Sequence, residues 1–237
     1  MNDSRPALPS RDSLDAVLLD AGGVLVDPDW HRVSGLLARL GIDMPADRLL
    51  AAEPRARWTL DRPEHMEGVD DTRRAFLYYD LVLAGAGRTE PVPPEVWEEV
   101  RAEHARSNLW RMVRPGVPEA LARLRAAGLR LAVVSNANGT VVSLMQDVGL
   151  VSYFDAILDS FVEGVEKPEP EIFRRALSRV DTGPERALHV GDLYQVDVLG
   201  ARSAGVAAAL IDAGGFYAEA DCPRFSSLPA LVDALLG

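Results

Sequence analysis

The sequence predicts an α/β protein whose core is a parallel sheet covered by helices on both faces. Two observations favour this fold class: short apolar runs alternate with helical segments, and Gly-containing turns separate them. A third observation is a long, polar-rich helical block after the first apolar run, which predicts an inserted helical domain. We expect right-handed crossovers between the strands, as in nearly all parallel sheets.

Five short apolar runs predict the strands, and each ends at a turn that is rich in Gly, Ser, Asn or Asp. Such runs are typical of strands that are buried on both faces. The runs cover residues 16–19, 129–134, 156–158, 187–190 and 206–211. Segments with helical apolar spacing lie at residues 30–40, 119–127, 140–148, 170–180, 196–204 and 229–236.

The order of these segments predicts two domains. Residues 14–29 and 108–237 would form a Rossmann-like core, because they contain every predicted strand. Residues 30–107 read as helical throughout and would form an inserted cap. Residues 1–13 are polar and contain two prolines, so we expect a flexible N-terminal tail.

Composition narrows the class of protein. The chain of 237 residues has 25 basic and 36 acidic side chains and a formal net charge of −11, which argues against a nucleic-acid partner. The single cysteine, Cys222, excludes an intrachain disulfide and a cysteine-based zinc site. No segment resembles a membrane span or a signal peptide. We therefore expect a cytoplasmic protein without a membrane partner, either a monomer or a homodimer.

Polar side chains follow three of the predicted strands. Asp20, Ser135 with Asn136, and Asp192 stand at strand ends, which share one edge of a parallel sheet. Facing carboxylates repel each other, and a hard divalent cation such as Mg²⁺ resolves the repulsion because it prefers oxygen ligands. Asp197, at the start of the next predicted helix, is placed to orient the metal or its water molecules.

Two further features predict a phosphate site. Ser135 and Asn136 lie between a strand and a helix, where hydroxyl, amide and free backbone N–H groups suit a phosphate. The chain has 24 arginines and only one lysine, Lys167, which precedes a proline in a loop. A compact ammonium at this position would neutralise a carboxylate nucleophile and a phosphoryl oxygen together.

These residues, in this order, resemble the four motifs of the haloacid dehalogenase (HAD) superfamily. The motifs are Asp20-Ala-Gly-Gly-Val-Leu, Ser135-Asn-Ala-Asn-Gly, Lys167-Pro, and Gly191-Asp192 followed by Asp197. The helical insert after the first motif is similar to the C1-type cap of subfamily I. The resemblance covers nearly the whole chain beyond the first dozen residues.

Most members of this superfamily are Mg²⁺-dependent phosphatases, and the resemblance implies a role for each matching residue. Asp20 would attack phosphorus and form an aspartyl-phosphate, and Ser135 and Lys167 would hold the phosphoryl oxygens. The Mg²⁺ ligands would be Asp20, the Gly22 carbonyl and Asp192, with Asp197 in support. The implied partner is a small phosphorylated metabolite, such as a sugar phosphate, over which the cap would close.

Gly22 departs from the family pattern. The family usually has a second Asp there, which protonates the leaving oxygen and then activates water. A glycine moves no proton, and losing a general acid–base typically lowers the rate by about 10²- to 10⁴-fold. Asp27, His31 or a side chain of the cap are candidates to replace it.

This departure leaves several hypotheses open. A phosphatase would need less acid assistance with a good leaving group, as in sugar 1-phosphates or acyl phosphates. A 2-haloacid dehalogenase expels a halide, which needs no proton, but such enzymes typically carry Tyr at the position of Gly22 and use no Mg²⁺. The open hypotheses also include a catalytically weak or inactive binding protein and a phosphomutase. The acidic pair Asp192 and Asp197 favours a metal, and therefore the phosphatase.

Three other polar residues are interpreted as structural. His189 lies inside a predicted strand and reads as a core histidine. Tyr194 lies between Asp192 and Asp197 and is expected to pack. Cys222 has no partner and is assigned no role.

Overall fold

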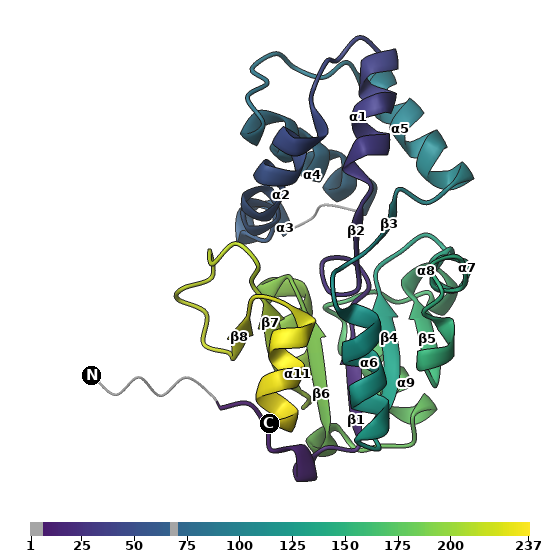
Figure 1. The fold of residues 1–237 in the computed structure, drawn as a ribbon, viewed down its shortest axis with the longest axis vertical. Helices are drawn as coiled ribbons and strands as arrows, with labels where there is room; N and C mark the ends of the chain where they lie inside the picture. Colours follow the sequence, from purple (N-terminus) through teal and green to yellow (C-terminus); the bar gives the residue numbers. More distant parts are fainter. Residues whose placement is uncertain (1–6, 67–70) are drawn as a thin grey trace. The chain divides into compact units, whose positions relative to one another are not determined.

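The computed structural model describes residues 7–66 and 71–237, and the chain divides into two compact units. One unit comprises Met1–Asp27 and Val113–Gly237, and the other comprises Pro28–Met112 (Figure 1). Residues 1–6 of the predicted tail and 67–70 of the predicted cap lie outside the described residues. The rest of the predicted tail includes a turn of 3-10 helix over Arg11–Ser13. The Arg11 side chain anchors this turn by donating hydrogen bonds to backbone carbonyls, including that of Ala127.

A six-stranded parallel sheet is the centre of the first unit, with the strand order β5-β4-β1-β6-β7-β8. The α/β fold class and all five predicted strands are confirmed. The sequence does not predict β8, because it has only two residues and depends on pairing with the end of β7. The strands are β1 (Ala16–Leu19), β4 (Arg130–Ser135), β5 (Ala156–Asp159), β6 (Ala187–Gly191), β7 (Ala207–Ile211) and β8 (Arg224–Phe225).

Helices cover both faces of this sheet. All four residues of β1 are fully buried, which requires apolar cover on each side because alternate side chains point to opposite faces. Ala16 and Leu18 pack in one apolar cluster with α9, whereas α6 and α11 lie together in front of the sheet in Figure 1. The helices are α6 (Val117–Ala126), α7 (Val141–Asp147), α8 (Ser160–Glu163), α9 (Pro170–Arg179), α10 (Leu199–Ser203) and α11 (Leu228–Leu236).

The helix expected over 196–204 is split into two parts. A π-helical turn over Tyr194–Val198 leads directly into α10. Single-turn π segments often occur at functional sites, and this one contains Asp197. Two further 3-10 turns lie at Val151–Tyr153 and Pro184–Arg186.

The position of β1 explains how distant residues can converge. It lies between β4 and β6, and Leu19 is in register with Val133 on one side and Val190 on the other. The chain therefore leaves the same edge of the sheet at Asp20, at the end of β4 and at the end of β6.

The second unit is helical, as the sequence predicts. Its buried core contains Trp30 and Val33 of α1, Val82 of α4 and Trp97 of α5. Gly85 lets α4 approach α2 closely, since a Cβ there would lie 3.1 Å from the Ala52 Cβ. Among the described helices of the chain, none is both long and apolar enough to cross a membrane. The helices of this unit are α1 (Trp30–Arg39), α2 (Ala46–Leu60), α3 (Pro63–Met66), α4 (Asp71–Gly85) and α5 (Pro94–Arg106).

A two-stranded ribbon contains both places where the chain passes from one unit to the other. It pairs β2 (Val26–Pro28) with β3 (Trp110–Val113), and the sequence predicts neither strand. Both strands are too short, at three and four residues, for an apolar pattern to identify them, so their pairing depends on the fold around them.

The central position of β1 predicts a large effect of Leu18→Ala. Leu18 is fully buried, and removing its side chain leaves a cavity, so the free energy of unfolding should fall by about 2–5 kcal/mol. Val142→Ala is the control in the same unit: Val142 is 45% exposed, and the change should stay within about 0.5 kcal/mol. Urea denaturation measures both values. Equal effects of the two changes would contradict the packing of β1 described above.

Candidate active site

Asp20 is the first residue after β1 and is almost buried, with 9% of its surface exposed. Its backbone N–H donates to the Val190 carbonyl at 2.9 Å, which extends the pairing of β1 with β6 by one residue. Its Oδ1 accepts a hydrogen bond from the Ala21 N–H at 2.7 Å and lies 2.9 Å from the Lys167 Nζ. The carboxylate is therefore held in one orientation at the edge of the sheet.

A tight turn follows Asp20. Gly23 takes the left-handed conformation, with φ 70°, whereas Gly22 does not and forms a bridge with Val26. Arg114 ties the turn down by donating a hydrogen bond to the Gly23 carbonyl. Asp27 and His31, two of the candidates to replace the missing acid, differ in their surroundings. Asp27 lies 3.5 Å from the Arg114 guanidinium, and His31 is exposed on α1.

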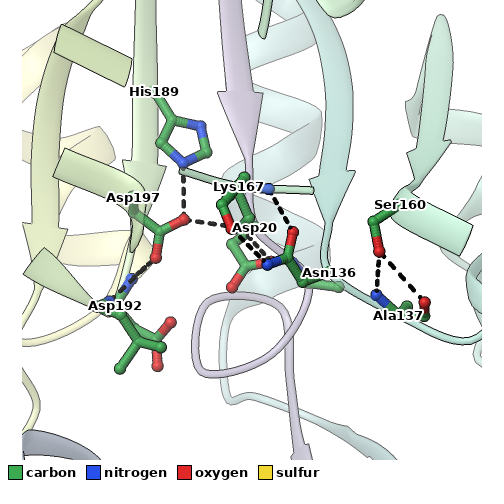
Figure 2. A network of polar contacts seen from close by, with 10 residues as sticks. Asp20, Asn136, Ala137, Ser160, Lys167, His189, Asp192 and Asp197 are labelled. Carbon is green, nitrogen blue, oxygen red and sulfur yellow. Dashed lines mark hydrogen bonds and ion pairs between the residues drawn. The ribbon is translucent and has the colours of Figure 1, made fainter. Parts of the chain in front are cut away.

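Lys167 is buried between two carboxylates (Figure 2). Its Nζ lies 2.9 Å from Asp20 Oδ1 and 2.7 Å from Asp197 Oδ1, and only 1% of the residue is exposed. Burial alone would lower the pKa of Lys167, but the charges of Asp197 and Asp20 outweigh burial and hold it above its ordinary value. Lys167 is therefore a permanent cation beside Asp20.

Asp197 is fully buried and each of its oxygens has two donors. Oδ1 accepts hydrogen bonds from the Lys167 ammonium at 2.7 Å and from the His189 Nε2–H at 2.9 Å. Oδ2 accepts from the backbone N–H groups of Asp192 at 3.1 Å and Leu193 at 3.0 Å. Burial would raise the pKa of Asp197, but the Lys167 charge and the His189 hydrogen bond outweigh it and keep this pKa below its usual range. With its oxygens occupied, Asp197 is better placed to hold Lys167 than to bind a metal directly.

Gly191 has no side chain and so leaves space for that of Asp197. A Cβ at Gly191 would lie 2.0 Å from the Asp197 Cγ, which is far inside van der Waals contact. Gly200 has a related role beside Lys167, because a Cβ there would lie 2.9 Å from the Pro168 Cα. Two glycines thus let the π-helical turn and α10 pack against the end of β6 and the loop that carries Lys167.

The Asn136 side chain makes contacts that the sequence does not predict. Its side-chain amide donates to the Lys167 carbonyl at 2.8 Å, and its side-chain oxygen accepts from the Lys167 N–H at 2.8 Å. These two hydrogen bonds clamp the backbone of Lys167. Because both polar atoms face the Lys167 backbone, Asn136 positions the lysine, a task that sequence spacing does not reveal.

Ser135 lies at the end of β4, 5% exposed and in register with Asp159 on β5. The sequence assigns no role to Asp159 or Ser160, yet both hold the loop after β4. The Asp159 carboxylate accepts from the Gly139 N–H at 3.0 Å, and Ser160 Oγ accepts from the Ala137 N–H at 3.0 Å. The available signal was the position of Asp159, which follows a predicted strand as Asp20 and Asp192 do.

Three acidic residues form a group that could hold a metal ion. Ligand oxygens of Asp20, Asp192 and Asp197 all lie within 4.8 Å of one another. Burial and the nearby Asp197 charge raise the pKa of Asp20, despite the opposing charge of Lys167. Three carboxylates against one ammonium leave two negative charges, which a divalent cation balances. Since the cluster offers only carboxylate oxygens, this chemistry fits Mg²⁺.

Comparison with known proteins identifies the family. The model of the haloacid dehalogenase-like hydrolases matches residues 14–205, and the chain belongs to this family of hydrolases. The solved structure of the putative HAD-hydrolase YfnB from Bacillus subtilis, bound to magnesium, shares the fold with a TM-score of 0.70. The match has 18% identity and covers 94% of this chain and 99% of that one. The C1 type of the cap stays a prediction.

Curated relatives match over part of their length. The chain is 34% identical over 128 residues to haloacid dehalogenase-like hydrolase domain-containing protein 3 of Bos taurus, covering 54% of this chain and 50% of the relative. It is 42% identical over 107 residues to a phosphoserine phosphatase of Thermus thermophilus, covering 42% of each. The chain thus spans about half the length of the curated relatives it matches.

The contact between Gly191 and Asp197 predicts that Gly191→Ala is destabilising. The new methyl group would displace the Asp197 side chain from its donors, and the free energy of unfolding should fall by about 1–3 kcal/mol. Gly35→Ala in α1 is the control, because the nearest atom to its new Cβ lies 3.9 Å away. Thermal unfolding measures both. A Gly191→Ala variant as stable as the control would show that Asp197 can move without loss.

Proposed function

We propose that this protein is a cytoplasmic, Mg²⁺-dependent phosphatase that hydrolyses small phosphomonoesters. One observation carries the proposal: Asp20, Asp192 and Asp197 form one cluster, and the only lysine of the chain lies 2.9 Å from Asp20. Phosphoryl transfer requires a positioned nucleophile and groups that stabilise charge on the transferred phosphoryl oxygens. The cluster contains candidates for each.

Asp20 is the proposed nucleophile. Its carboxylate would attack phosphorus, so that a bond from Asp20 to phosphorus forms while the ester P–O bond breaks and the leaving oxygen departs with the bonding electrons and takes a proton from water. Water would then attack the aspartyl-phosphate, releasing inorganic phosphate and restoring Asp20. Lys167 would remain beside Asp20 throughout and stabilise the phosphoryl oxygens, since its high pKa keeps it protonated.

Ser135 and the loop that follows it are the proposed phosphate-binding elements. Ser135 would donate its hydroxyl, and the loop would offer backbone N–H groups. Asp159 and Ser160 support this assignment because they hold the backbone of the loop at Gly139 and Ala137.

Asp20, the Gly22 carbonyl and Asp192 are the proposed ligands of Mg²⁺, with Asp197 in support. Once bound, the cation would offset the negative charge of the carboxylates and of the phosphoryl group. Asp197 contributes through its neighbours: its Oδ1 accepts from Lys167, and its Oδ2 accepts from the Asp192 N–H.

Gly22 restricts the proposed substrates. Without a carboxyl group at this position, the leaving oxygen receives little assistance from a general acid. Phosphorylated compounds with better leaving groups, such as sugar 1-phosphates and acyl phosphates, depend least on that assistance. We therefore infer that such compounds are better substrates than phosphates of ordinary alcohols.

Gly22 also favours a second candidate function, the hydrolysis of 2-haloacids, because a halide leaves without a proton. Two observations weigh against it. The acidic cluster retains two negative charges in excess of Lys167, which suits a reaction with a divalent cation. Relatives such as the phosphoserine phosphatase of Thermus thermophilus are named for phosphate esters.

The first experiment measures phosphate release from sugar phosphates, acyl phosphates and an activated aryl phosphate, with and without Mg²⁺. We expect release that requires Mg²⁺ and that Asp20→Asn abolishes while the variant stays folded. Asparagine has nearly the same shape but is a poor nucleophile and ligand, so the variant is its own packing control. Turnover retained in Asp20→Asn would refute the nucleophile. No release from any ester, with halide release from 2-haloacids instead, would favour the dehalogenase.

The second experiment restores the missing carboxyl group with Gly22→Asp. Gly22 does not occupy the left-handed region, so its backbone conformation is one that residues with side chains adopt. We expect a faster reaction with poor leaving groups, by about 10-fold or more, and little change with acyl phosphates. An unchanged rate in a folded variant would indicate that another group already moves the proton.

A further inference from the structure

His189 occupies an unusual position for a polar residue. It lies in the middle of β6 between Leu188 and Val190, is fully buried, and packs edge-on against the Phe173 ring at 5.0 Å. Its Nε2 lies 2.9 Å from Asp197 Oδ1, whereas its Nδ1 has no partner among the described residues. A buried polar atom without a partner destabilises a fold, so an apolar side chain would suit this position better.

The chemistry of the contact explains the histidine. Asp197 is a carboxylate and can only accept, so Nε2 carries the hydrogen and donates it to Oδ1. The same oxygen receives the Lys167 ammonium at 2.7 Å, and that ammonium lies 2.9 Å from Asp20. His189, Asp197, Lys167 and Asp20 therefore form one continuous chain of contacts (Figure 2).

We propose that His189 is a positioning residue that holds Asp197 so that the Lys167 ammonium stays against Asp20. The backbone N–H groups of Asp192 and Leu193 bind only Oδ2. Among the contacts of Oδ1 within the described residues, His189 is therefore the one besides Lys167 that fixes its position. Without it, the carboxylate turns about its Cβ–Cγ bond and the ammonium follows. The effect on turnover rests on the proposed phosphatase function, but the placement of Lys167 does not.

The single lysine provides a direct test. Labelling with ¹⁵N-lysine gives one side-chain ammonium signal, which reports the environment of Lys167 without assignment. In His189→Leu, which keeps the volume but loses the donor, we expect the signal to move and its hydrogens to exchange faster. In His189→Gln, whose amide N–H reaches a similar point, we expect the wild-type signal. Leu188→Val is the control, since Leu188 is a buried neighbour on β6 without a polar group.

Turnover supplies the second readout. A group displaced by about 1 Å can lose two orders of magnitude in rate, so kcat should fall by about 10- to 100-fold in His189→Leu. It should stay within about threefold of wild type in His189→Gln, because the donor is retained. Thermal stability of His189→Leu should fall, because the buried Asp197 Oδ1 loses a donor and removing the unpaired Nδ1 offsets only part of that loss.

Three results would overturn the proposal: an unchanged Lys167 signal in His189→Leu, wild-type kcat in that variant, or a Gln variant with a displaced signal. If His189→Leu does not fold, His189→Gln and the control still decide, because a displaced lysine signal in folded His189→Gln contradicts the proposal. If wild-type protein releases no phosphate from any ester, the proposed function fails, and the lysine signal tests the placement on its own.

Discussion

The sheet edge that carries the candidate active site depends on one buried cation, Lys167. Lys167 is almost completely inaccessible, and an unpaired ammonium at such a position is too costly to be tolerated. Asp20 and Asp197 offset that cost from opposite sides, at 2.9 and 2.7 Å. Each carboxylate is in turn tolerated because Lys167 is present. The three groups are mutually required, so the strand ends and loops that carry them must bring them within hydrogen-bonding distance.

The surrounding residues allow Lys167, Asp20 and Asp197 to come into contact. Gly191 leaves space for the Asp197 side chain, and a π-helical turn places that side chain where backbone N–H groups can bind it. Asn136 clamps the backbone of Lys167 from the neighbouring strand end. The fully buried His189 completes the set of donors around Asp197. The stability of this edge and the position of the cation are therefore two consequences of the same contacts.

With glycine at position 22, the site has groups that can stabilise charge but no side chain at this position that can transfer a proton. The cluster keeps a carboxylate nucleophile candidate, a permanent cation and oxygen groups suited to a hard metal ion, which are the parts that stabilise charge in phosphoryl transfer. It lacks the side chain that would handle the proton of the leaving group. Under the proposed function, the chemistry of the leaving group would decide which substrates this site turns over. Family membership shows the fold and the hydrolytic class, whereas the restriction of substrates by Gly22 is part of the proposal.

The sequence by itself determined the sheet, the helical insert and the strand-end residues, because apolar periodicity and chain order encode burial and connectivity. It indicated Asp20, Lys167, Asp192 and Asp197 as one group through their order and positions. Only the tertiary structure decided that the Asn136 side chain binds the backbone of Lys167, that His189 contacts Asp197, and that the short strands β2, β3 and β8 exist. These features depend on contacts between residues far apart in the chain, whose distances and orientations no local pattern records.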